Sequence, residues 1–204
     1  MAVTFSHPAL LVVDVQRDFC PGGALAVRNG DEVIPGLNRV IEVFERRKLP
    51  IFFTRDWHPA NHISFRSRGG IWPTHCVQGT LGAEFHPGLK IPVAAVIISK
   101  GISKDGEAYS GFHGTDLEER LKSLGVDEIF LGGLTTDYCV RESTLDARKA
   151  GFSVTVIEDC TRAVDARPDD GARALADMRR AGARLETSFE VVKQMASTWR
   201  RSHS

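Results

Sequence analysis

Cys139 is the residue best suited to covalent chemistry. It lies in the segment GGLTTDYCVRESTLDARKAG, where two glycines close an apolar run and a helical pattern follows. Thr136 or Asp137 can cap that helix, which would place Cys139 in its first turn. A helix N-terminus favours the thiolate, the nucleophilic form of cysteine. The segment therefore predicts a nucleophile; the alternative is a buried cysteine that packs as a small apolar side chain.

A nucleophilic thiol needs a group that accepts its proton. Asp14 stands near the end of the apolar run PALLVVDV, and Lys100 follows VAAVIIS. Asp14 could act as general base toward Cys139 and then as general acid toward the group that departs. Lys100 would stabilise the thiolate and a developing oxyanion. The alternative is a structural ion pair between Asp14 and Lys100, because buried charges must pair in any protein.

A second group of reactive side chains lies in the segment 55–92, which is dense in Gly, Pro, His and Trp and shows no regular period. Long irregular segments inside a domain are usually functional. The motifs RDWHPANHISF and WPTHCVQGT supply Asp56, His58, His62 and His75. Such carboxylate and imidazole donors suit zinc, iron or manganese. Loop histidines also serve as simple hydrogen-bonding residues, so the spacing alone leaves both interpretations open.

The alternation of apolar runs and helical patterns along the chain indicates how these reactive side chains are positioned. Strands are expected at 8–15, 50–54, 93–99, 128–133 and 153–159, with a sixth through 183–187, and helices at 31–48, 115–124, 137–150, 168–181 and 188–199. This alternation predicts an α/β protein with three α/β/α layers and a mainly parallel six-stranded sheet. In such sheets ligands bind at the carboxyl ends of the strands. Asp14, Asp56, Lys100 and Cys139 should therefore converge on one edge.

Composition and charge restrict the class of protein. The 204 residues, 42% of them hydrophobic, suit one domain over 1–204 with a metal-binding loop at about 55–92. Lys plus Arg and Asp plus Glu number 26 each, so long-range attraction to nucleic acid or an anionic membrane is not expected. The N-terminus lacks a signal-peptide pattern, and a cytoplasmic protein is expected. Cys20, Cys76, Cys139 and Cys160 are widely spaced, which favours reduced thiols.

Six motifs in sequence order resemble the nicotinamidases of the isochorismatase-like cysteine hydrolase superfamily. They are VVDVQRDFCPGGAL, TRDWHPANHISF, WPTHCVQGTLGAEFHP, the lysine of IISKG, AYSGF and GGLTTDYCVRESTLDA, and together they cover nearly the whole chain. The resemblance implies the isochorismatase-like hydrolase fold. It also implies hydrolysis of nicotinamide to nicotinic acid and ammonia through a cysteine thioester, as in NAD salvage, with pyrazinamide as a second substrate.

The resemblance also assigns roles to residues. It implies a catalytic triad of Asp14, Lys100 and Cys139. It implies a divalent metal, Zn2+ by expectation with Fe2+ or Mn2+ as alternatives, that orients the pyridine ring. The implied metal ligands are Asp56, His58 and His75, with His62 as a second choice because only some members use that histidine.

Further roles concern the oxyanion hole and the pocket. The family places a cis peptide before the oxyanion-hole residue, here between Leu134 and Thr135, and the amides of Thr135 and Cys139 would face the substrate oxygen. Many members carry alanine where this chain has Thr135, which should leave the backbone donor unaffected. The resemblance also suggests pocket walls around a flat ring, for which core packing is the alternative. The wall residues are Phe19, Trp72, Tyr109 and Leu134.

Two other functions are alternatives to nicotinamide hydrolysis. One is a different amidohydrolase of the superfamily, acting on a carbamoyl or ureido substrate, although such relatives generally lack the Asp and paired His residues. The other is a non-catalytic metal- or ligand-binding module, since a fold alone does not establish activity. The presence of all three triad residues argues against this module. Association into a homo-oligomer is also expected, because family members often associate.

Overall fold

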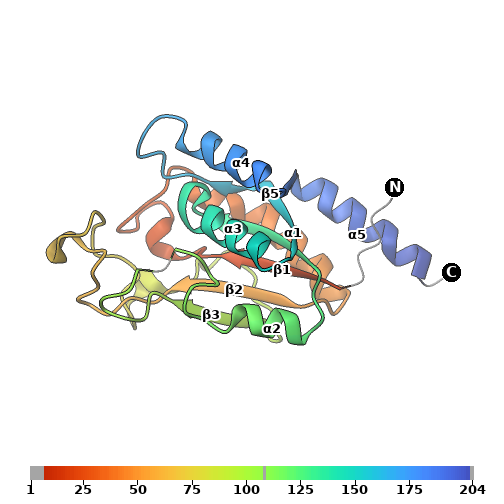
Figure 1. Ribbon diagram of the computed structural model, residues 1–204, viewed down its shortest axis with the longest axis horizontal. Coiled ribbons are helices and arrows are strands. Elements are labelled where there is room, and N and C mark those ends of the chain that lie inside the picture. Colours follow the sequence, from red (N-terminus) through yellow and green to blue (C-terminus); the bar gives the residue numbers. More distant parts are fainter. Residues whose placement is uncertain (1–6, 108, 203–204) are drawn as a thin grey trace.

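The computed structural model describes residues 7–107 and 109–202, which form a six-stranded sheet between two layers of helices (Figure 1). The strands are β1 (Pro8–Val13), β2 (Ile51–Asp56), β3 (Val96–Lys100), β4 (Glu128–Leu134), β5 (Ser153–Arg162) and β6 (Arg184–Glu186). Their order is β3-β2-β1-β4-β5-β6, and each neighbouring pair is parallel. The predicted fold class is therefore confirmed, with a sheet that is wholly parallel rather than mainly so.

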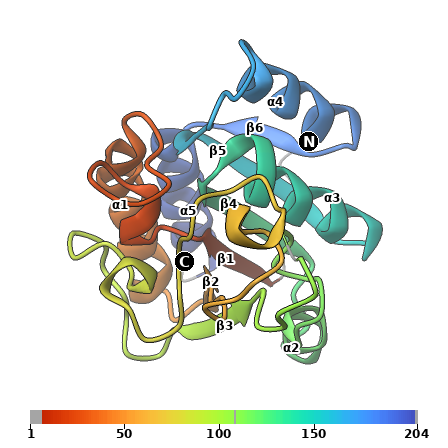
Figure 2. The same ribbon diagram turned by 90° about the vertical axis from the view of Figure 1, so that its left-hand side faces the viewer.

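In the described part of the chain, five α-helices cover the two faces of the sheet (Figure 2). They are α1 (Val33–Arg46), α2 (Leu117–Ser123), α3 (Arg141–Lys149), α4 (Asp170–Arg180) and α5 (Ser188–Ser202). In β1, Leu10 and Val12 pack with the cluster beneath α1 and α5, while Ala9, Leu11 and Val13 pack with the cluster beneath α2, α3 and α4. A strand buried on both faces must be apolar at every position, which is why β1 reads as an unbroken apolar run.

Strand boundaries differ from the prediction where local turns intervene. β1 ends at Val13 instead of 15, because Asp14 adopts a left-handed conformation with φ 48° and its carbonyl accepts the Gln16 amide. β3 begins at Val96 instead of 93, because the Ala95 amide closes a turn onto the Pro92 carbonyl. β2 and β5 run two and three residues further than predicted, to Asp56 and Arg162.

Close contact between β1 and β4 depends on Gly133. Its φ is +133°, and a Cβ at this position would lie 2.0 Å from the Val13 carbonyl oxygen. The register of β4 against β5 also shifts between Leu131 and Gly133. Only glycine permits this approach. The approach keeps the ends of β1 and β4, and the residues that follow them, side by side.

The irregular segment after β2 folds back on itself instead of forming regular structure. The His58 amide donates to the Cys76 carbonyl, and the Gln78 amide donates to the His58 carbonyl. Within it lie only two short 3-10 turns, Arg66–Arg68 and Leu81–Ala83, among its described elements. The hydrogen bonds bring the two histidine-containing motifs of this segment together.

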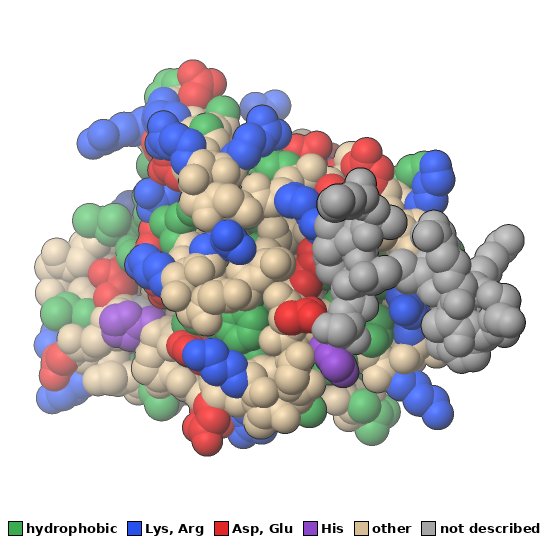
Figure 3. All heavy atoms as spheres, turned by 45° about the vertical axis from the view of Figure 1, so that its right-hand side comes forward, with side chains coloured by type: hydrophobic (Ala, Val, Ile, Leu, Met, Phe, Trp, Pro, Cys, Tyr) green, Lys and Arg blue, Asp and Glu red, His purple; other side chains and the backbone are tan. Residues whose placement is uncertain are grey.

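Charges on the surface are mixed. On the face in Figure 3, basic and acidic side chains are scattered among uncharged ones, in keeping with equal totals of 26 each. Within the described part of the chain, none of the helices is long and apolar enough to cross a bilayer.

Candidate active site

Four buried reactive side chains meet at the carboxyl edge of the sheet. Asp14 follows β1, Asp56 ends β2, Lys100 ends β3, and Cys139 lies in a π-helical turn, η5 (Thr136–Val140), after β4. Because β1 and β4 neighbour each other in the centre of the sheet, Asp14 and Cys139 stand at the position where strand order reverses direction. Ligands of open parallel sheets bind at such switch points.

Lys100 is the centre of this group. Its Nζ atom lies 2.8 Å from Oδ2 of Asp14 and 3.5 Å from the sulfur of Cys139. Burial alone would lower the pKa of Lys100, but the charges of Asp14 and Asp56 outweigh it and raise the pKa well above its usual value. The ammonium therefore stays protonated and fixes a positive charge beside the thiol.

Asp14 is held so that its carboxylate faces the thiol. The Thr54 hydroxyl donates to Oδ1 of Asp14 at 2.6 Å, and a carboxylate oxygen of Asp14 lies within 4.8 Å of the Cys139 sulfur. Burial raises the pKa of Asp14, and Lys100 only partly offsets the rise. A carboxylate with a raised pKa is a better proton acceptor than an exposed one, which suits general base catalysis.

Cys139 differs from the sequence-based expectation in its ionisation. Burial raises the pKa of the thiol well above its usual value, although Lys100 lowers it. The expected stabilisation of the thiolate by a helix N-terminus is therefore outweighed by desolvation. The resting form is the thiol, which must lose its proton to Asp14 during attack.

The predicted helix caps also differ. Thr135 holds the N-cap position of η5, without a side-chain cap. The Thr136 hydroxyl bonds to that of Thr161 instead, and the Asp137 carboxylate accepts the amides of Val164 and Asp165. These two side chains thus tie the Cys139 turn to the segment after β5.

Three side chains beside this group form a donor set for a metal ion. One ligand atom each from Asp56, His58 and His75 can be chosen so that all three lie within 4.8 Å of one another. Nδ1 of His58 donates to the Gly101 carbonyl at 2.9 Å, and Nδ1 of His75 donates to the Pro73 carbonyl at 2.8 Å. Such bonds fix the tautomer and leave each Nε2 lone pair for a ligand. The residues therefore fit a divalent cation.

The charges of the donor set also suit a cation. Burial lowers the pKa of His75, so its imidazole is neutral. Burial would raise the pKa of Asp56, but Lys100 and His58 outweigh it and hold the carboxyl ionised. Burial would lower the pKa of His58, but the Asp56 carboxylate outweighs it and raises that pKa. Metal ligands must be deprotonated. Asp56 and His75 meet that condition, and a cation that binds at His58 displaces its Nε2 proton. Gly101 permits the close approach, since a Cβ there would lie 2.4 Å from Cε1 of His58.

His62 lies beside the donor set without an available nitrogen. Its ring stacks on His58 with centroids 4.1 Å apart. Its Nδ1 bonds to the Ser64 hydroxyl at 2.7 Å, and its Nε2 donates to the Gly106 carbonyl at 3.0 Å. Both ring nitrogens are thus engaged within the protein. This arrangement favours a role for His62 in supporting His58.

A cavity opens onto the thiol and the donor set. The predicted residues among its lining are Phe19, Asp56, His58, His62, Trp72, His75, Tyr109, Thr135 and Cys139. Among the predicted wall residues, Leu134 is the exception: its side chain is fully buried in the core cluster with α1 and α5. Its neighbour Thr135 lines the cavity instead. The Leu134–Thr135 peptide bond is cis, as predicted.

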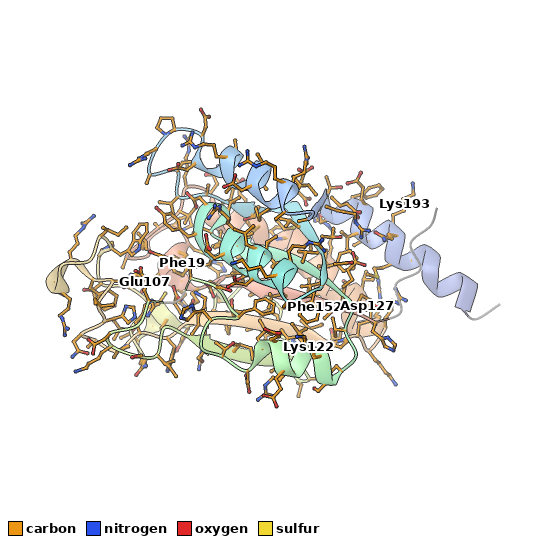
Figure 4. The ribbon with its side chains drawn as sticks, in the orientation of Figure 1. Phe19, Glu107, Lys122, Asp127, Phe152 and Lys193 are labelled. Carbon is orange, nitrogen blue, oxygen red and sulfur yellow. The ribbon has the colours of Figure 1, made fainter. Side chains whose placement is uncertain are left out.

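Five lining residues were not identified from the sequence. They are Leu25, Ser64, Glu107, Tyr138 and Val164. Only Tyr138, adjacent to Cys139, carried a usable signal, because an aromatic residue beside a nucleophile can contact its substrate. The others come from loops whose place in space the sequence pattern does not reveal. Figure 4 shows Phe19 and Glu107 at the same end of the molecule, where the strand-end loops gather.

Aromatic contacts hold the walls of the cavity. Nε1 of Trp72 donates to the Tyr109 hydroxyl at 3.0 Å. The Tyr138 ring lies edge-on to Trp72, with centroids 5.0 Å apart. On the other wall Phe19 contacts His75, with ring centroids 5.7 Å apart. The cavity is thus shaped for a small flat ring, with a thiol and a metal-binding set inside it.

Comparison with known proteins agrees with this architecture. Residues 8–190 match the model of the isochorismatase domain. The nicotinamidase of Escherichia coli (strain K12) is 40% identical over 200 residues, covering 88% of this chain and 94% of that protein. A pyrazinamidase of Pyrococcus horikoshii in complex with zinc has a TM-score of 0.85 and 50% identity, covering 89% of this chain and 99% of its own. An L. infantum protein in complex with nicotinate has a TM-score of 0.84 and 38% identity, covering 92% of this chain and 97% of its own. The chain belongs to the isochorismatase family.

Proposed function

We propose that this protein is a nicotinamidase, an amidohydrolase that converts nicotinamide to nicotinic acid and ammonia. The observation that carries the proposal is the position of the Cys139 thiol, which shares one aromatic-walled cavity with the donor set of Asp56, His58 and His75. The similarity to the E. coli nicotinamidase supports the choice of substrate. Pyrazinamide, which also has a flat nitrogen-containing ring with a carboxamide, is a second substrate.

Asp56, His58 and His75 hold the divalent cation, and Zn2+ is the ion we propose because the P. horikoshii relative was crystallised with zinc. The same donor types also accept Fe2+ or Mn2+. When bound, the ion supplies a Lewis acid for the ring nitrogen of the substrate. Phe19, Trp72 and Tyr109 confine the ring, so that binding presents the carboxamide carbon to Cys139.

In the first half-reaction, the Cys139 thiol gives its proton to the Asp14 carboxylate as the sulfur bonds to the carboxamide carbon. The amide carbonyl becomes an oxyanion. The backbone amides of Thr135 and Cys139 donate to it, and one such donor contributes about 3–4 kcal/mol to transition-state stability. Asp14 then returns the proton to the nitrogen, the C–N bond breaks, and ammonia leaves a thioester on Cys139.

In the second half-reaction, Asp14 accepts a proton from water as the water oxygen attacks the thioester carbon. The C–S bond breaks, the sulfur regains its proton from Asp14, and nicotinic acid is released. Its carboxyl group then gives a proton to water, which leaves nicotinate. Lys100 remains an ammonium throughout. Its fixed charge stabilises negative charge on the sulfur and keeps the Asp14 carboxylate close to it.

Ammonia release from a panel of amides tests the proposal. The purified protein is incubated with nicotinamide, pyrazinamide, benzamide and a ureido compound, with and without a chelator. We expect rapid release from the two ring-nitrogen amides, slow release from benzamide, and loss of activity on chelation that Zn2+ restores. Rapid release from the ureido compound with none from nicotinamide would instead assign the protein to the carbamoyl-hydrolysing members of the family.

A further inference from the structure

Glu107 gives the cavity wall a negative charge that the proposed chemistry does not use. Its side chain is exposed and lines the same cavity as Cys139 and His75. Among the described residues, the lining contains no lysine or arginine. Lys100 is buried, and its Nζ lies 3.5 Å from the Cys139 sulfur. The ion pairs of the described residues do not include Glu107. The wall therefore carries a carboxylate without a lysine or arginine partner, while the cations of the site are Lys100 and the proposed metal ion.

This carboxylate lies beside the aromatic wall of the cavity. The Tyr109 hydroxyl accepts the Nε1–H of Trp72 at 3.0 Å. Burial and the neighbouring Glu107 raise the pKa of Tyr109, so the phenol stays protonated. Trp72, Tyr109 and Glu107 all line the cavity. The charge of Glu107 therefore acts on a ligand that occupies the ring site.

The reaction changes the charge of the bound molecule. Nicotinamide is neutral, whereas nicotinate is an anion at neutral pH. A fixed carboxylate leaves the binding of a neutral ring nearly unchanged and weakens the binding of an anion of the same shape. We infer that Glu107 is a specificity-determining residue that disfavours anionic ligands and so limits retention of the carboxylate product; this inference rests on the proposed function.

The charge of Glu107 should have a modest effect on the dissociation constant of an anionic ligand. Two unit charges that face each other across a hydrated cavity repel enough to change a dissociation constant about threefold. The effect should decrease with salt, because exposed charges at such distances are screened. A residue that only supports Tyr109 would show neither a dependence on the sign of its charge nor this salt dependence.

The test is a comparison of the dissociation constants of nicotinate and nicotinamide, measured by calorimetry on zinc-loaded protein. The Cys139→Ala background prevents turnover. Glu107→Gln should lower the ratio of the nicotinate to the nicotinamide constant about threefold, and Glu107→Lys about tenfold. Both changes should shrink at high ionic strength. Asp105→Asn and Asp105→Lys are the matched controls, because Asp105 lies on the same loop, pairs with Arg68 at 3.5 Å and does not line the cavity.

Unchanged ratios in both Glu107 variants would overturn the inference, as would equal changes in the Asp105 variants. A similar loss of both ligands in Glu107→Gln and Glu107→Lys would also overturn it, since that result indicates a structural role. Failure of the proposed function is a separate result: it appears as a lack of ammonia release from nicotinamide by the parent protein. The ratio of binding constants does not depend on turnover.

Discussion

Lys100 and Asp56 form a buried ion pair in which Nζ lies 2.5 Å from Oδ1. The second carboxylate oxygen of Asp56 lies 3.5 Å from Nε2 of His58. Asp56 therefore belongs both to the proposed metal site and to the charge cluster around Cys139. The two halves of the site share one electrostatic network, so a change of charge in one half alters the electrostatic environment of the other.

Replacing Lys100 with Met tests this network. The change leaves Asp14 and Asp56 as buried carboxylates without the ammonium between them, and breaking a buried charge pair costs about 3–5 kcal/mol. We expect the free energy of unfolding in urea to fall by about that amount, together with weaker metal binding. The control is Lys90→Met, because the exposed Lys90 ammonium lies 3.9 Å from Glu42 and such pairs contribute at most about 1 kcal/mol. Equal losses in the two variants would show that the network does not stabilise the fold.

The role of the thiol is tested by Cys139→Ala. Without a nucleophile, kcat for nicotinamide should fall by about 10⁴-fold or more, while calorimetry still detects binding of nicotinamide. Cys160→Ala is the matched control, since Cys160 is also buried but does not line the cavity. It should retain the activity of the parent protein. Substantial ammonia release by Cys139→Ala would rule out covalent catalysis at this position.

The donor set is tested by His75→Ala and His62→Ala. Loss of a residue that only orients a ligand lowers metal affinity about 10–100-fold, and loss of a ligand costs more. His75→Ala should therefore purify with little metal. His62→Ala should keep near-stoichiometric metal with weaker affinity, because both nitrogens of His62 are engaged elsewhere. Metal content and competition with a chelator measure both effects; if His62→Ala were the metal-free variant, the proposed ligands would be wrong.

Glu128 should make stability depend on pH. Burial raises the pKa of this carboxyl to about 7 from an ordinary 4.5, although Arg184 lowers it. The folded protein thus holds the proton more tightly than the unfolded chain. The stabilisation is complete below about pH 4.5 and is lost as the pH rises through about 7.

The variant Glu128→Gln stays uncharged at all pH values. Relative to the parent protein, its free energy of unfolding should increase by roughly 1–3 kcal/mol between about pH 5 and about pH 8. Urea unfolding at the two pH values measures the difference. Glu118→Gln, which alters an exposed glutamate on α2, should show no such trend. An unchanged difference for Glu128→Gln would mean that the buried carboxyl is already ionised at low pH.

The amino-acid sequence determined the order of the elements and most of the reactive residues. Continuous apolar strands and intervening amphipathic helices specify a parallel sheet, and the carboxyl ends of parallel strands must share one edge. Asp14, Lys100 and Cys139 could therefore be placed together without coordinates. The motifs around Asp56, His58 and His75 could also be recognised from the sequence, because few side-chain types can bind a metal.

Other properties were decided only by the tertiary structure, because they depend on residues distant in the sequence. Burial under several elements keeps the Cys139 thiol protonated, against the local tendency of a helix N-terminus. The direction of Leu134 into the core and the engagement of both His62 nitrogens depend on packing against α1 and on the Gly106 carbonyl. Glu107 reaches the cavity through the path of its loop. Desolvation and side-chain direction are set by neighbours in space, which a local sequence pattern does not specify.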